Sequence, residues 1–77
     1  MEIIILGTGC SRCKALEAAV RRVVDATGID ATVRKEEDMA RIMEYNVMAL
    51  PALVVDGNVV SKGKVLNETE VQTLLGL

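Results

Sequence analysis

The feature that most constrains the fold is a change of hydrophobic period between residues 2–6 and the segment that follows Ser11. Residues 2–6 read EIIIL, a short run of aliphatic and β-branched side chains that is typical of a strand buried on both faces. After Ser11 the apolar residues recur at the spacing of one helical stripe, and Gly28 marks the expected end of that helix. The stripe consists of Leu16, Ala19, Val20 and Val23. A doubly buried strand followed by an amphipathic helix predicts an α/β fold in which helices flank a sheet.

The next part of the chain repeats this order of strand and helix. Residues 30–35, DATVRK, are predicted to form a second strand. The acidic residues at 36–38 place negative charge where the first turn of a helix favours it, and Asn46 can end that helix. Its apolar stripe consists of Met39, Ile42 and Met43. We interpret Met39 and Met43 mainly as core residues because of their helical spacing.

Two further strands joined by a tight turn come next. Residues 52–55 and 58–61 are apolar or β-branched runs that flank Asp56-Gly57. This dipeptide is a strong signal for a two-residue hairpin turn. The third and fourth strands are therefore expected to pair with each other in antiparallel fashion.

The last helix has the best-marked start in the chain. A capping box and a hydrophobic staple are formed by Leu66, Asn67, Glu70 and Val71, and Leu74 and Leu75 complete the apolar stripe. The predicted order is β-α-β-α-β-β-α, with a parallel start and an antiparallel finish to one mixed four-stranded sheet. With no repeat or linker in its 77 residues, the chain is expected to form a single domain over 1–77.

Several chemistries are excluded because residue types are missing. The chain has no His, Trp or Phe, and Tyr45 is its one aromatic residue. There is therefore no imidazole base, no Cys/His zinc site and no aromatic platform on which nucleic-acid bases could stack. The formal net charge of −2 gives no cationic surface for phosphate backbones. Nucleic acid is not an expected partner.

The N-terminal segment points to a cytoplasmic protein. The apolar run at residues 3–6 has no basic leader and is too short for a signal-peptide core or a membrane span. We therefore expect the cytoplasm as its location, no membrane partner, and a monomer, because nothing marks an obligate oligomer. Thiols are kept reduced in the cytoplasm, which argues against a purely structural disulfide.

Both cysteines lie in one CxxC motif, at the junction between the first strand and the first helix. Cys10 is expected near the helix cap and Cys13 one turn further in, so that the two sulfurs lie on the same side. The helix N-terminus, with Arg12 and Lys14 nearby, favours a thiolate at Cys10. We predict that Cys10 is the nucleophile of disulfide exchange and that Cys13 resolves the mixed disulfide, with Ser11, Arg12 and Lys14 in supporting positions.

Other interpretations of this loop were weighed. Gly7 and Gly9 could open a dinucleotide fingerprint, but its third glycine would fall at Arg12 and the chain is too short for such a domain. Two thiolates also suit a soft ion such as Cu(I) or Zn, as in small metal carriers. Those carriers end in a strand and have a methionine where this chain has Gly9. The metal carrier remains the alternative function, and chance placement or a non-catalytic binding module remain further alternatives.

Taken together, the motifs resemble those of the thioredoxin superfamily, most closely its short, glutaredoxin-sized redox-active disulfide proteins. The resemblance covers nearly the whole chain: a strand, CSRC, a helix, a strand, a helix, Leu50-Pro51, a hairpin, Gly63 and a last helix. It implies a thioredoxin-like α/β fold and a thiol–disulfide oxidoreductase that exchanges two electrons with protein or small-molecule disulfides. Its redox group is the Cys10–Cys13 disulfide, with no other cofactor and no metal, and an unidentified reductase regenerates it.

The resemblance also assigns roles to residues outside the CxxC. Pro51 is expected to be cis and to pack beside the disulfide, although a trans proline at a strand start would also be tolerated. Leu50, with Ala49 and Met48 before it, is expected to bind an extended substrate segment by strand addition. Gly63 matches the glycine that leaves room at the site, and an ordinary turn glycine is an equal alternative.

The sequence departs from the family at several positions. Gly9 stands where thioredoxins have Trp, and Ser11-Arg12 replaces their Gly-Pro and the Pro-Tyr of glutaredoxins. Only one glycine, Gly63, stands where glutaredoxins have a Gly-Gly pair. Glutathione binding and use of a standard thioredoxin reductase are therefore unsupported. No buried acid that would assist proton transfer is evident, and water or Lys35 could substitute.

Overall fold

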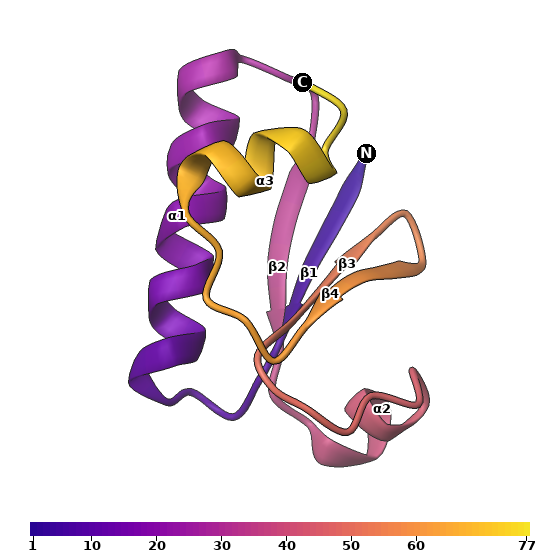
Figure 1. Ribbon diagram of the computed structural model, residues 1–77. Coiled ribbons are helices and arrows are strands. Elements are labelled where there is room, and N and C mark those ends of the chain that lie inside the picture. Colours follow the sequence, from indigo (N-terminus) through magenta and orange to yellow (C-terminus); the bar gives the residue numbers. More distant parts are fainter.

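The structure, a computed structural model that describes residues 1–77, has one mixed sheet with helices on both faces (Figure 1). Its strands are β1 (Glu2–Leu6), β2 (Thr32–Glu36), β3 (Ala52–Val55) and β4 (Asn58–Lys62), in the spatial order β2-β1-β3-β4. β1 pairs with β2 in parallel, and the other two pairings are antiparallel. The element order and the mixed four-stranded sheet predicted from the sequence are confirmed.

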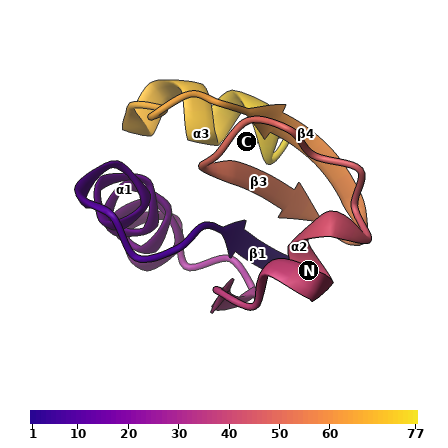
Figure 2. The ribbon, with the colours of Figure 1, turned by 90° about the horizontal axis from the view of Figure 1, so that it is seen from below.

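The sheet separates the core into two layers, and helices cover both of them. The helices are α1 (Ser11–Thr27), α2 (Met39–Met43) and α3 (Glu68–Leu74). α1 and α3 cover one face of the sheet and α2 covers the other, as Figure 2 shows. None of the three has the length and apolar character needed to cross a membrane.

β1 is buried on both faces, as its run of aliphatic residues predicts. Successive side chains of a strand point to opposite faces. Ile3 and Ile5 accordingly lie in the core beneath α1 and α3, whereas Ile4 and Leu6 lie in the core beneath α2. This central strand therefore fixes where the following loop, with both cysteines, leaves the sheet.

The long helix α1 is oriented by the stripe that the sequence indicates. All of its predicted core residues, Leu16, Ala19, Val20 and Val23, are buried. Burial of a Leu or Val side chain stabilises the fold by about 1.5–3 kcal/mol. The helix ends at Gly28, whose φ of 67° is left-handed and whose N–H donates to the Val24 carbonyl. The helix axis is thus held against the sheet, with its N-terminus at the loop after β1.

The β3–β4 hairpin turns at Asp56-Gly57, as predicted. Both residues have positive φ, 48° and 83°, which is the geometry of a type I′ turn. The pairing shifts between Leu53 and Val54 because β4 contains one extra residue there. At the open end of the hairpin the Gly63 N–H donates to the Pro51 carbonyl at 2.8 Å.

The prediction for the methionines of α2 is wrong. Met39 is 48% exposed and Met43 57% exposed, and Ile42 is the one buried residue of this helix. A helix of only five residues places one side chain on the sheet, so that the other two apolar positions remain at the surface. β2 also differs from the prediction, because it ends at Glu36, one residue later than expected. Asp38 caps α2, where its side chain accepts a hydrogen bond from the Ala40 N–H.

The cap of α3 gives a stability prediction. The Asn67 side chain accepts from the Glu70 N–H at 2.8 Å, and the Glu70 side chain accepts from the Asn67 N–H at 3.0 Å. We expect Asn67→Ala to lower the free energy of unfolding by about 1 kcal/mol, measured by urea denaturation. Asn67→Asp preserves the cap and serves as the control. Equal stability of the alanine variant and the wild type would contradict the assigned role.

Candidate active site

The two cysteines lie within contact distance at the start of α1. Cys10 is the N-cap residue and Cys13 lies in the first turn. Their Sγ atoms are 3.1 Å apart, and both are free thiols. A disulfide bond is about 2.05 Å long, so a small displacement would join the two sulfurs. The loop after β1 and the first helical turn therefore hold a dithiol that is ready to close.

The two thiols differ in exposure and in acidity. Cys10 is exposed, whereas Cys13 is buried with 6% of its surface accessible. The pKa of Cys10 lies below its ordinary value, first because the Cys13 side chain donates a hydrogen bond to its sulfur and second because the Cys13 backbone N–H does so. Burial raises the pKa of Cys13, and its hydrogen bond to Cys10 and the charge of Cys10 raise that pKa further.

The lowered pKa of Cys10 has its main causes in hydrogen bonds to its sulfur. The Cys13 side chain contributes most, and backbone amides of the first turn contribute further, as expected for a helix N-terminus. The added effect of positive charge from Arg12 and Lys14 stays a prediction. Both side chains are exposed, and Arg12 is directed toward a different partner, described below. The lowered pKa of Cys10 thus depends first on the Cys13 thiol and then on the backbone amides of the helix N-terminus.

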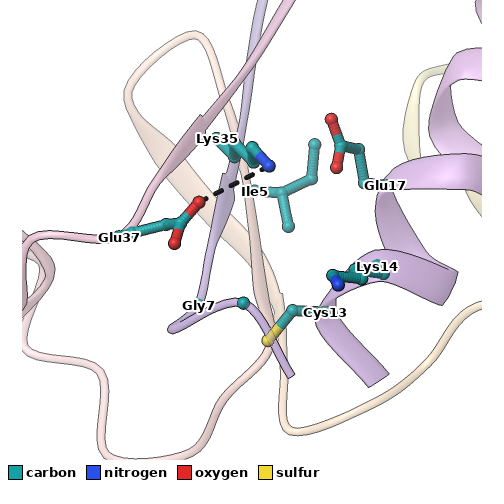
Figure 3. Close-up of a pocket in the computed structure, with 8 residues that line it drawn as sticks. Ile5, Gly7, Cys13, Lys14, Glu17, Lys35 and Glu37 are labelled. Atoms are coloured by element: carbon teal, nitrogen blue, oxygen red, sulfur yellow. Dashed lines mark ion pairs between the residues drawn. The ribbon is translucent and has the colours of Figure 1, made fainter. Parts of the chain in front are cut away.

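Gly7 packs directly against Cys13, a contact that we did not predict from the sequence. A Cβ atom at Gly7 would overlap the Cys13 Sγ and lie 3.0 Å from the Cys13 Cβ. Figure 3 shows the Cys13 sulfur directed toward Gly7. Any other side chain at this position would displace Cys13. A glycine directly after the first strand was the available signal, but it was read only as part of the rejected dinucleotide fingerprint.

A small recess lies beside Cys13. Its lining residues are Ile5, Gly7, Gly9, Cys13, Lys14, Glu17, Lys35 and Glu37 (Figure 3). Its volume of about 10 Å³ is close to what one water molecule needs. Lys35 Nζ lies 3.5 Å from Glu37 Oε1. The fold thus brings Lys35, together with Glu17 and Glu37, to the buried side of the cysteine pair.

The second half of the site is formed by Pro51 and Gly63. The Leu50–Pro51 peptide bond is cis, and Pro51 is buried. Gly63 has a φ of 73°, and a Cβ there would lie 3.0 Å from the Cβ of Ala49. Arg12 Nη2 donates to the Gly63 carbonyl at 2.9 Å, across 51 positions of sequence. A chain of hydrogen bonds from Arg12 through Gly63 to Pro51 therefore links the CxxC to the proline loop.

The remaining predicted residues lie at the surface of the same region. Ser11 is exposed as the first residue of α1. Met48 is 93% exposed, Ala49 is exposed and Leu50 is half-buried against the core beneath α2. The backbone groups of residues 48–50 make no hydrogen bonds within the chain. No group of three or more Cys, Asp or Glu side chains is placed to hold a metal ion.

Comparisons with known proteins agree with this arrangement. Residues 1–76 match the family described as thioredoxin domain. A thioredoxin of Methanothermobacter thermautotrophicus is 41% identical over 75 residues, which cover 97% of each chain. A thioredoxin of Methanocaldococcus jannaschii is 34% identical over 70 residues, 91% of this chain and 80% of the relative. A solved structure described as a malarial protein has the same fold, with a TM-score of 0.72, 12% identity and coverage of 97% and 92% of the two chains.

Proposed function

This chain belongs to the thioredoxin domain family and is a thiol–disulfide oxidoreductase, and from that premise we propose that it reduces protein or small-molecule disulfides with Cys10 as nucleophile and Cys13 as resolving thiol. The observation that carries the proposal is the asymmetry of the pair. The exposed sulfur has the lowered pKa, and the buried sulfur 3.1 Å away has the raised one. An accessible thiolate is the attacking species in disulfide exchange, and a protonated neighbour within reach is the group that must resolve it.

The proposed reaction has two displacement steps. The Cys10 thiolate attacks one sulfur of the substrate disulfide, the substrate S–S bond breaks, and a mixed disulfide with Cys10 forms. The released substrate thiolate takes a proton. Cys13 then loses its proton and attacks the Cys10 sulfur, which releases the second substrate thiol and closes Cys10–Cys13. Two electrons and two protons pass to the substrate, and the protein is left oxidised.

Residues 48–51 are proposed to align the substrate for attack. The unpaired backbone groups of residues 48–50, next to the buried Pro51, can pair with an extended segment in the manner of an added strand. Met48, almost fully exposed, offers a flexible thioether surface that adapts to different partners. Arg12 and Gly63 hold this loop in place relative to Cys10.

Further parts of the proposal concern the cellular setting. The cysteine pair itself carries the electrons, so we propose that the protein needs no other cofactor. We also propose that the protein works as a monomer. We place it in the cytoplasm, where a reductase of unidentified type returns Cys10–Cys13 to the dithiol.

Insulin reduction tests the proposed function. The protein, with dithiothreitol as electron source, is expected to accelerate insulin precipitation over dithiothreitol alone. A metal carrier would instead bind Cu(I) or Zn(II) one-to-one and retain it against glutathione. A binding module on this scaffold would keep its partner after Cys10→Ser. Failure to reduce insulin, together with an ordinary thiol pKa at Cys10, would refute the oxidoreductase.

A further inference from the structure

The basic side chains of this acidic protein are unevenly paired. Of the nine Lys and Arg residues, five have a carboxylate oxygen within 4 Å, namely Arg21, Arg22, Arg34, Lys35 and Arg41. The four without such a partner are Arg12, Lys14, Lys62 and Lys64. Arg12 and Lys14 lie in the first turn of α1, and Lys62 and Lys64 flank Gly63. All four therefore lie at the end of the molecule that carries Cys10.

Three of these cations lie on one side of the cysteine pair. Arg12 reaches the Gly63 carbonyl at 2.9 Å, which places its guanidinium beside the segment that contains Lys62 and Lys64. All three residues are exposed. Lys14 instead lines the recess beside Cys13 (Figure 3). We call Arg12, Lys62 and Lys64 the basic rim.

A groove extends from the basic rim between β4 and α3. Lys62 and Lys64 line it, and its apolar lining is Val60, Leu66 and Leu74. Its volume is about 390 Å³, enough for several side chains of an extended segment. The one carboxylate in the lining, Glu70, already accepts the hydrogen bond of the capping box. No carboxylate oxygen lies within 4 Å of any of the three rim cations, so their charge is available to a bound segment.

We propose that the basic rim selects substrate proteins whose reactive disulfide is flanked by acidic residues, an inference that rests on the proposed function. An acidic segment that approaches Cys10 meets a thiolate, which repels it, and the rim offsets this repulsion with three unpaired cations. Complementary charge at the edge of an interface mainly raises the association rate and rejects partners of like charge.

The test compares peptide disulfides of one sequence with Glu, Gln or Lys on both sides of the reactive cysteine. For the wild type we expect the highest kcat/KM with the Glu peptide, a lower value with the Gln peptide and the lowest with the Lys peptide. At about 0.01 M salt, kcat/KM for the Glu peptide should be about tenfold that for the Lys peptide. The ratio should fall toward one at about 1 M salt, where the screening length is about 3 Å. Equal kcat/KM for the three peptides would contradict substrate selection by the basic rim but would leave the proposed oxidoreductase function standing. If no peptide is reduced, the proposed function fails and the rim fails with it.

Two double variants with the same change of net charge locate the effect. Lys62→Gln with Lys64→Gln removes two rim charges, and we expect the Glu-to-Lys ratio to fall from about tenfold to about threefold or less. Arg21→Gln with Arg22→Gln removes two charges that lie about 16 Å or more further along α1 from Cys10, and we expect the ratio to stay near the wild-type value. Because each ratio compares peptides on one preparation, differences in folded fraction cancel. An equal fall in both variants would show that net charge alone acts and would overturn the proposal.

Discussion

Cys10→Ser is expected to reduce insulin no faster than dithiothreitol alone. A serine hydroxyl is a far weaker nucleophile at neutral pH than the thiolate it replaces, and this chain has no histidine to activate it. The buried Cys13 cannot take over the attack, because burial raises its pKa and limits access of the substrate.

Cys13→Ser is the matched variant, because it leaves the nucleophile in place. Cys10 should still attack, but the mixed disulfide with the substrate cannot be resolved from within the protein. Non-reducing mass spectrometry is expected to find a one-to-one covalent adduct with Cys13→Ser and none with Cys10→Ser. Adducts of equal yield on both variants, or insulin reduction by Cys10→Ser, would contradict the assignment of the two roles.

Gly7→Ala is expected to lower the free energy of unfolding by about 1–3 kcal/mol, the usual cost of overpacking a well-packed site. The added methyl group would overlap the Cys13 sulfur, so that either the loop after β1 or the helix start has to move. Such a loss is a large fraction of the stability of a small domain. Urea denaturation with Cys13 reduced measures it.

A double-mutant cycle assigns this cost to the contact with Cys13. In a Cys13→Ala background the sulfur is gone, and Gly7→Ala should cost clearly less than it does in the wild type. An equal cost of Gly7→Ala in both backgrounds would refute the steric contact.

Sequence patterns predicted the elements whose signals are local. The continuous aliphatic run of β1 is a local signal, and it correctly predicts that Ile3 to Leu6 form a strand buried on both faces. The capping box at Asn67 and the turn at Asp56-Gly57 are likewise formed within a few residues, and both occur as predicted. The position of the CxxC at a helix N-terminus followed from these elements.

Contacts between distant segments could not be read from the sequence. The core role expected for Met39 and Met43 depended on the length of α2 and on which of its sides meets the sheet. The packing of Gly7 against Cys13 depends on the path of the loop between them. The bond from Arg12 to Gly63 spans 51 residues and required knowledge of where the hairpin ends. Residue spacing carries no information on these three points.

The most direct test of the account measures the alkylation rate of each cysteine with iodoacetamide across pH, by mass spectrometry of the reduced protein. Only the thiolate reacts, so each rate follows the ionisation of its own sulfur. We expect Cys10 to become reactive at a pH below that of an ordinary thiol, because its pKa is lowered, and Cys13 to react only at higher pH and more slowly. Two cysteines that ionise together like ordinary thiols, or a Cys13 that reacts first, would contradict the claim that Cys10 is the nucleophile.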